Sequence, residues 1–313
     1  MSGPLAGAIE SVAMKPPLDR GALAREISSL ANGNQPTALT NIRVTEPIAS
    51  HARRIAITGA PGAGKSTLCG HLARLRASDR RYAILAVDPS SPRSGGAILG
   101  DRIRIDELDG TADLYVRSLA SRSSHDGLAD NLPAILETLD RHGFDEVLLE
   151  TVGVGQADYA VRILVDTVVL VLHPESGDIV QAMKAGIMEM ADLFVVNKSD
   201  LPAADKCAGD IKRILSLTQR TSDDWTPRVL NTSSKDPASI ARLSEAIDAH
   251  EAWRTSSPRR IDRTRAMQRY VLQRALDRSI ADAIGRLPAE LYGRALNEQF
   301  EWVVTQVRPP VER

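Results

Sequence analysis

The sequence predicts an α/β protein built on a doubly wound, mostly parallel sheet. Three observations support this fold class. Short apolar runs alternate with stretches of helical period through the middle of the chain. A glycine-rich stretch, GAPGAGKST, joins one such run to one such helix. The chain has 313 residues, 43% of them hydrophobic, so it can bury a sizeable core. We therefore expect one large domain with appendages.

Seven apolar runs are expected to be strands, because they are short and bounded by turn residues. They are Ile55–Thr58, Tyr82–Val87, Leu114–Arg117, Val147–Glu150, Thr167–Leu172, Leu193–Val196 and Arg228–Leu230. Helical spacing marks three intervening faces. These faces are Leu68, Leu72 and Leu75; Ile135, Leu136 and Leu139; and Ala182, Met183, Gly186, Ile187 and Met190.

Further helices are expected on both sides of this domain. Before it, Leu23, Ile27 and Leu30 indicate a helix, which is followed by a polar linker from Asn32 to Ser50. After it, and beyond the break SSPRR, one helical stripe holds Leu272, Leu276, Ile280, Ile284 and Leu287. We divide the chain into an N-terminal helical segment with its linker (1–50), a nucleotide-binding domain (51–256) and a C-terminal helical extension (257–313).

Composition excludes several classes of function. Lys and Arg total 39 against 40 Asp and Glu, a net charge of -1, so neither nucleic acid nor an anionic membrane is an expected partner. Two cysteines are too few for a disulfide framework and favour a reducing cytoplasm. The first residues do not read as a signal peptide, and no apolar run reaches membrane-spanning length. We expect a soluble, cytoplasmic protein.

The stretch GAPGAGKST has the pattern G-x-x-x-x-G-K-[ST], which holds a nucleotide's phosphates. Gly59 and Gly64 let backbone N–H groups turn inward, Lys65 reaches the β and γ oxygens, and the Ser66 hydroxyl is a ligand for Mg²⁺. Ala60, Pro61, Gly62, Ala63 and Thr67 complete the loop. A strand before it and a helix after it favour this interpretation over a chance glycine-rich turn.

The base is indicated by NKSD, Asn197 to Asp200, at the end of an expected strand. A carboxylate there accepts two hydrogen bonds from guanine, whereas the unprotonated N1 of adenine leaves it unpaired, which is costly. Asp200, with Asn197 and Lys198 beside it, therefore favours GTP and GDP over ATP. Ser233 and Ser234, in the following stretch NTSSK, are weaker candidates for backbone contacts to the same base.

The stretch LLETVGVGQ, Leu148 to Gln156, has the pattern of a γ-phosphate switch. Glu150 suits a water-mediated contact to Mg²⁺, and the Gly153 N–H suits the γ-phosphate. Val154 stands where Ras-like switches carry a water-orienting glutamine, so unassisted hydrolysis should be slow. Gln156 is either a glutamine that a rearrangement brings in or a plain surface residue.

Two aspartates in AVDPSSPRSGGAILGDRIR are candidates for the same metal. Asp88 ends the second expected strand, at the sheet edge where ligands collect in doubly wound folds. Asp101 follows a glycine-rich turn. Capping of a turn or helix is an equally good interpretation for either residue.

Five stretches together resemble the MeaB/MMAA/ArgK family of SIMIBI-class P-loop GTPases, between about Arg54 and Asp200. They are GAPGAGKST, AVDPSSPRSGGAILGDRIR, ETVGVGQAD, PESGDIVQAMKAG and GIMEMADLFVVNKSD. Members of that family act as GTP-dependent chaperones of adenosylcobalamin-dependent acyl-CoA mutases, such as methylmalonyl-CoA mutase, and gate cofactor delivery. The resemblance therefore implies such a mutase as partner, with adenosylcobalamin involved only through it.

The resemblance also implies roles for individual residues. Ser66, Asp88, Asp101 and Glu150 match the family's magnesium positions, Lys65 its phosphate lysine, and Asn197, Lys198 and Asp200 its base-recognition positions. Glu175 to Lys184 matches a third switch, with Asp178 and Lys184 as its charged members. The family is homodimeric through a C-terminal extension, to which the stripe Leu272 to Leu287 corresponds; packing within the chain is the alternative. A departure at Ser121 to Asn131, with one glycine instead of a Gly-Gly element, leaves the identity of the mutase open.

Two other functions are considered. A nickel-delivery GTPase needs a cluster of soft or imidazole ligands, whereas the six histidines are scattered and Cys69 and Cys207 lie far apart in the sequence. An ATP-using kinase or transport ATPase, a label attached to some ArgK relatives, conflicts with Asp200.

Overall fold

The computed structural model describes residues 15–32, 51–89, 113–121, 131–151, 157–175, 177, 186–217, 221, 223–256 and 263–307. Residues 33–50 of the expected linker, together with Asp101, Gly153, Gln156 and Lys184, lie outside these residues; Asn32, the expected first residue of the linker, is helical. None of the described helices is long and apolar enough to cross a membrane.

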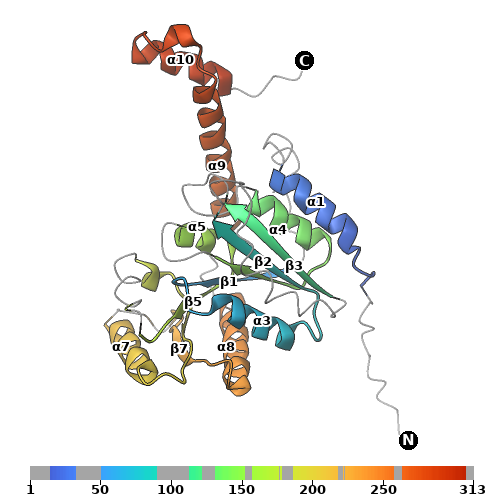
Figure 1. Ribbon diagram of the computed structural model, residues 1–313, viewed down its shortest axis with the longest axis vertical. Coiled ribbons are helices and arrows are strands. Elements are labelled where there is room, and N and C mark those ends of the chain that lie inside the picture. Colours follow the sequence, from blue (N-terminus) through green and yellow to red (C-terminus); the bar gives the residue numbers. More distant parts are fainter. Residues whose placement is uncertain are drawn as a thin grey trace, which may run out of the picture.

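A seven-stranded sheet, parallel throughout, forms the centre of the molecule (Figure 1). The strands are β1 (Arg53–Thr58), β2 (Tyr82–Pro89), β3 (Leu114–Ser121), β4 (Glu146–Glu150), β5 (Thr167–Leu172), β6 (Leu193–Val196) and β7 (Arg228–Asn231). Their order in the sheet is β3-β2-β4-β1-β5-β6-β7. The predicted fold class is confirmed, and each of the seven expected strands is present, five of them one to four residues longer than expected.

Helices cover both faces of this sheet. On one face lie α1 (Arg20–Asn32), α4 (Leu132–Arg141), α5 (Ala157–Leu164) and α7 (Ala204–Ser216); on the other lie α3 (Lys65–Arg76) and α8 (Pro237–Ser256). Side chains of a strand alternate between the faces. In β1, Ala56 packs toward α4 and α5, while Ile55 and Ile57 pack toward α3 and α8. Both faces are buried, as in other parallel sheets.

The helical stripe predicted for α3 is wrong at one position. Leu68 and Leu72 are buried, but Leu75 is 44% exposed and Arg76 takes the interior position. The Arg76 guanidinium turns inward because Glu146 on β4 accepts two hydrogen bonds from it, at 2.5 and 2.6 Å. Periodicity detects apolar side chains and therefore missed a buried ion pair at this site.

The other predicted helical faces have mixed outcomes. Ile135, Leu136 and Leu139 of α4 are fully buried. The stretch from Ala182 to Met190 is described only at its end, where a 3₁₀ turn, η3 (Ile187–Glu189), replaces the expected α-helical turns. Met188 and Met190 are buried there beside α7.

The N-terminal helix α1 is part of the main core. Leu23 and Ile27 are fully buried against α4 and the sheet, and Leu30 is partly buried. Polar contacts add to this packing, since Arg117 on β3 donates to the Ser28 hydroxyl at 2.8 Å and Arg20 donates to the Leu114 carbonyl at 2.6 Å.

The C-terminal helices form an arm that projects from the domain (Figure 1). The arm consists of α9 (Arg263–Gly285), the 3₁₀ turn η4 (Ala289–Leu291) and α10 (Leu296–Val307). Near its start, α9 packs on the core beside α5 through Met267 and Tyr270. Farther out it packs against α10, and Ala283 in this part of α9 is fully buried.

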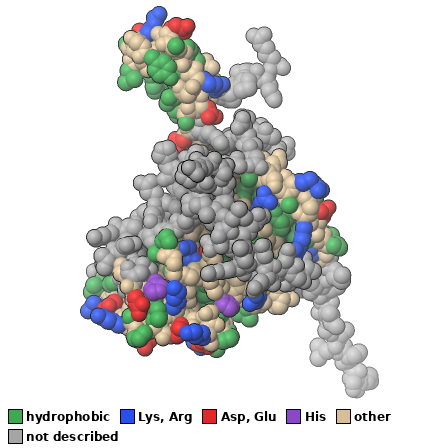
Figure 2. Space-filling view, viewed as in Figure 1, with side chains coloured by type: hydrophobic (Ala, Val, Ile, Leu, Met, Phe, Trp, Pro, Cys, Tyr) green, Lys and Arg blue, Asp and Glu red, His purple; other side chains and the backbone are tan. Residues whose placement is uncertain are grey.

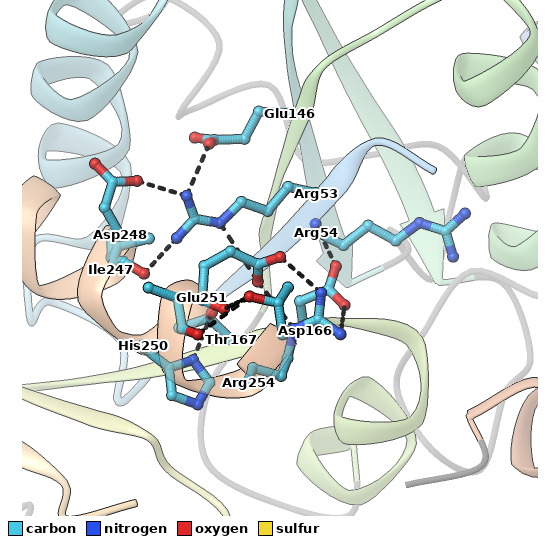
Figure 3. Close-up of polar contacts among 12 residues, drawn as sticks. Arg53, Arg54, Glu146, Asp166, Thr167, Ile247, Asp248, His250, Glu251 and Arg254 are labelled. Carbon is cyan, nitrogen blue, oxygen red and sulfur yellow. Dashed lines mark hydrogen bonds and ion pairs between the residues drawn. The ribbon is translucent and has the colours of Figure 1, made fainter. Parts of the chain in front are cut away.

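Charged residues line the amino-terminal edge of the sheet (Figure 3). The glycine loop follows the other end of β1. Arg53 on β1 donates to Asp248 on α8 at 2.5 Å, and the Arg54 N–H donates to Asp166 at 2.8 Å. Arg254 on α8 lies 3.3 Å from the other Asp166 oxygen. These contacts fix α8 across the ends of β1, β4 and β5.

Candidate nucleotide-binding site

The glycine loop connects β1 to α3 at the carboxyl-terminal edge of the sheet. Gly59, Gly62 and Gly64 have φ values of 140°, 82° and 88°, which side chains rarely tolerate. A Cβ on Gly59 would lie 2.0 Å from the Val171 carbonyl oxygen, and one on Gly64 would lie 2.5 Å from Asn197 Nδ2. Glycine is therefore required at both positions by close approach as well as by φ.

Lys65 begins α3 and reaches back across this loop. Its ammonium donates to the carbonyl oxygens of Gly59 at 2.9 Å and of Ala60 at 3.1 Å, and the residue is 8% exposed. A buried cation beside a helix amino terminus attracts anions strongly. The loop, with Pro61, Ala63 and Thr67 completing it, thus has the electrostatics of a phosphate site.

A hydroxyl and a carboxylate meet next to the loop. Ser66 Oγ donates to Glu150 Oε1 at 2.6 Å, which joins the first turn of α3 to the end of β4. Glu150 is 8% exposed. Hydroxyl and carboxylate oxygens are the donors that Mg²⁺ prefers, so these two residues fit the expected metal.

For the other two expected metal ligands, Asp88 and Asp101, the structure describes no side-chain position. The Asp88 backbone lies in β2, two residues beyond Ala86, which is the register partner of Glu150. Asp88 and Glu150 therefore leave the sheet at the same edge, but the Asp88 side chain and all of Asp101 lie outside the described residues.

The turn NKSD is fixed against the glycine loop. Asn197 follows β6, its N–H donates to the Leu172 carbonyl at 3.0 Å, and its amide Nδ2 donates to the Ala63 carbonyl at 2.8 Å. Lys198 has a left-handed φ of 55° and donates to the Gly62 carbonyl at 3.1 Å. The base-recognition turn and the phosphate loop are thereby held as one unit.

Asp200 ends this turn with both carboxylate oxygens paired. Lys235 Nζ lies 2.6 Å from Oδ2, and Ser233 Oγ donates to Oδ1 at 2.9 Å. The hydrogen bond from Lys235 and then that from Ser233 lower the pKa of Asp200. Asp200 is therefore ionised at neutral pH, as an acceptor for two base donors must be. Ser234, between the two partners, is exposed.

Thr232 belongs to this site although the sequence analysis did not select it. It is fully buried, and its Oγ1 donates to Asn197 Oδ1 at 3.0 Å while its carbonyl accepts the Ser199 N–H at 2.9 Å. It therefore orients the Asn197 amide toward the glycine loop. Its position directly after the last expected strand, within NTSSK, is the feature of the sequence that could have indicated this role.

Most of the residues expected to form the switches lie in parts of the chain that the structure does not describe. Gly153, Gln156, Asp178 and Lys184 lie outside the described residues. Glu175 is described and exposed, with its N–H donating to His173 Nδ1 at 3.2 Å just beyond β5. The structure thus places the start of the expected third switch at the same sheet edge as the glycine loop.

An ionised carboxylate set beside a glycine loop suits the purine that offers two donors on one edge, which is guanine. The fold and the site define the class, and this protein is a P-loop GTPase. The chain belongs to the family described as Methylmalonyl Co-A mutase-associated GTPase MeaB, whose model matches residues 23–286.

Individual relatives agree with this assignment. A protein of Pyrococcus horikoshii that is named as a GTPase is 34% identical over 292 residues, covering 92% of this chain and 89% of its own. GTPase ArgK of Escherichia coli is 34% identical over 217 residues, 68% of this chain and 66% of its own. The crystal structure of an LAO/AO transport system kinase superimposes with a TM-score of 0.54 at 23% identity, covering 93% and 99% of the two chains, which supports the fold.

Proposed function

We propose that this protein is a Mg²⁺-dependent GTPase that acts as a chaperone of an adenosylcobalamin-dependent acyl-CoA mutase of the methylmalonyl-CoA mutase type. GTP hydrolysis gates delivery of the cofactor to that mutase. The observation that carries the proposal is the ionised Asp200, aligned by Ser233 beside a complete phosphate loop, in a chain of the mutase-associated family. Residues 51–256 form the GTPase domain, between a helical segment (1–50) and a C-terminal extension (257–313).

Guanine pairs through N1–H and its exocyclic amine with the two oxygens of Asp200. Asn197 and Lys198 hold the recognition turn against the glycine loop, and Ser233 and Ser234 approach the base from the next loop. ATP is excluded because adenine would leave the Asp200 charge unpaired. This argues against the kinase or transport ATPase alternative.

Phosphates bind in the loop from Gly59 to Thr67. Lys65 exchanges its two carbonyl partners for β and γ oxygens, while backbone N–H groups turn toward the same oxygens. Ser66 and Glu150, with Asp88 and Asp101, would hold Mg²⁺, which supplies neutralisation of charge on the β- and γ-phosphates. The Gly153 N–H contacts the γ-phosphate.

The nickel-delivery alternative has less support. Cys69 and Cys207 are both buried and pack on opposite faces of the sheet, Cys69 toward α8 and Cys207 within α7. Among the described residues, no group of three or more His, Cys, Asp or Glu side chains is arranged to hold a metal. Soft-ligand transfer would need such a group.

Hydrolysis by the isolated protein is slow, because Val154 replaces the water-orienting glutamine of faster switches. Binding of the mutase reorders the segment Glu175 to Lys184 and brings Gln156 into use. The added charge and orientation raise the rate by about 10- to 10³-fold, short of the effect of an arginine finger.

The exposed arm suits a homodimer. Leu272, Leu276, Ile280 and Ile284 are 61%, 44%, 40% and 53% exposed along one line of α9. On α10, Leu296 and Phe300 are 80% and 66% exposed. Hydrophobic side chains accordingly gather on the visible face of the arm (Figure 2). Because so much apolar surface is exposed on a projecting element, we infer that a second copy of the chain packs against it.

A hydrolysis assay with and without a purified acyl-CoA mutase tests the coupling. We expect Lys184→Ala to keep GTP affinity and basal hydrolysis but to lose stimulation by the mutase. Lys65→Ala is the comparison, since it should lose phosphate binding and basal hydrolysis together. A fall in basal hydrolysis in Lys184→Ala as large as that in Lys65→Ala would place Lys184 in the phosphate site and refute the relay.

A further inference from the structure

Lys235 occupies a position that guanine needs. Its ammonium is 2.6 Å from Asp200 Oδ2, one of the two oxygens that the proposed function assigns to the base. The contact crosses between two loops, since Asp200 follows β6 and Lys235 follows β7. The sequence analysis gave this lysine no role of its own.

The two partners of Asp200 differ in how firmly they are held. Ser233 is 4% exposed, its N–H lies 3.1 Å from Ser239 Oγ, and its own Oγ accepts the Lys235 N–H at 3.2 Å. Ser233 is therefore a fixed donor that aligns the carboxylate from the protein side. The Lys235 side chain is 77% exposed, so little besides the charge of Asp200 holds its ammonium in place.

The two carboxylate oxygens of Asp200 also differ in how exposed their partners are. Oδ1 faces the buried Ser233, whereas Oδ2 faces the exposed Lys235. A base arriving from solvent therefore approaches the side that the ammonium covers. The ammonium and a guanine N–H would both donate to the ionised carboxylate, so both hydrogen bonds are charge-assisted, but only the ammonium adds attraction between two full charges. Entry of guanine thus requires that this ion pair open or shift.

We propose that Lys235 competes with guanine for Asp200, occupying the outward carboxylate oxygen in the empty protein and slowing entry of guanine nucleotides. The inference rests on the proposed pairing of guanine with Asp200. Ser233 stays in place during the exchange, while Lys235 is replaced by the base. Lys235 therefore tunes nucleotide exchange and does not participate in hydrolysis.

Stopped-flow binding of N-methylanthraniloyl-GDP to the full chain tests the proposal. The variant is Lys235→Gln, and the matched control is Lys212→Gln, which removes the same charge from an exposed position on α7. We expect Lys235→Gln to bind the probe about two- to fivefold faster than the control, as opening an exposed ion pair is a modest cost. Thermal unfolding should be unchanged in both variants.

A second comparison shows whether the effect acts through Asp200. In an Asp200→Asn background, probed with the corresponding xanthosine diphosphate, Lys235→Gln should cause no acceleration because the carboxylate is gone. Association of Lys235→Gln no faster than that of Lys212→Gln would overturn the competition, as would equal acceleration in both backgrounds. Failure of the wild type and the control to bind the GDP probe would instead count against the proposed function and remove the basis of this inference.

Discussion

At the scale of single residues, the site depends on side chains that hold other side chains. Asn197 is held by Thr232 at 3.0 Å and in turn holds the Ala63 carbonyl at 2.8 Å, so one buried amide joins the base loop to the phosphate loop. Gly64 leaves the space that this amide needs. The geometry of the loop therefore depends on residues that contact no phosphate.

Asp200 should determine which base is bound. We expect Asp200→Asn to weaken GDP binding by roughly 100-fold or more and to favour xanthosine diphosphate. The reason is that the xanthine carbonyl accepts a hydrogen bond where guanine donates one, and the new amide can supply it. Isothermal calorimetry with GDP, xanthosine diphosphate and ADP measures the preference. Similar affinities of the wild type for GDP and ADP would refute guanine recognition by this carboxylate.

At the scale of elements, the carboxyl-terminal and amino-terminal edges of the sheet differ in the contacts that they make. Loops at the carboxyl-terminal edge carry the candidate nucleotide site. At the amino-terminal edge, ion pairs join α8 to the strands (Figure 3), and the Arg76–Glu146 pair joins α3 to β4. Burial raises the pKa of Asp248, but the hydrogen bonds from Arg76 and Arg53 outweigh it, so that this pKa is lowered. Asp248 is therefore ionised at neutral pH.

The Arg76–Glu146 pair should contribute strongly to stability, because both side chains are 2% exposed. We expect Arg76→Met to lower the free energy of unfolding by about 3 kcal/mol, since it leaves Glu146 buried with weaker partners. Urea denaturation measures the loss. Arg80→Met is the matched control, because Arg80 reaches the same Glu146 at 3.4 Å from a side chain that is 34% exposed.

That control should cost at most about 1 kcal/mol. A double variant, Arg76→Met with Glu146→Leu, should recover part of the stability by removing the unpaired charge. Equal losses in Arg76→Met and Arg80→Met would show that burial of the pair is not what determines its contribution.

At the scale of the whole molecule, the arm is set apart from the nucleotide domain by its surface. In the GTPase domain large apolar side chains are mostly buried, whereas several on α9 and α10 are exposed. The beginning of α9 is anchored on the core through Met267 and Tyr270. We expect the exposed apolar side chains of the arm to pack against a second copy.

Charge placed on the stripe should separate the two copies. We expect Leu276→Asp combined with Ile280→Asp to give a mass near the 33.9 kDa of one chain in light scattering, against twice that value for the wild type. Ala281→Asp adds a charge beside the stripe on α9 and should leave the dimer intact. A wild-type protein that is monomeric, and whose oligomeric state is the same after deletion of the residues following Ser257, would contradict this role of the arm.

The sequence alone determined the fold class, the seven strands and the phosphate loop. These features are local, since strand runs, glycine positions and the loop pattern are each written within a few consecutive residues. The expected base preference also came from a short pattern, NKSD, because the Asp200 carboxylate can accept the two hydrogen bonds that guanine donates. The family resemblance added the prediction of a mutase partner.

The tertiary structure decided which residues from separate segments meet. Thr232 and Asn197 are 35 residues apart in the chain, Arg76 and Glu146 are 70 apart, and no periodicity links either pair. Lys235 reaches Asp200 only because β6 and β7 are neighbours in the sheet. Long-range pairing of polar groups depends on the order of the strands and on how the helices lie on them. The pattern of apolar residues in the sequence does not predict which polar groups pair.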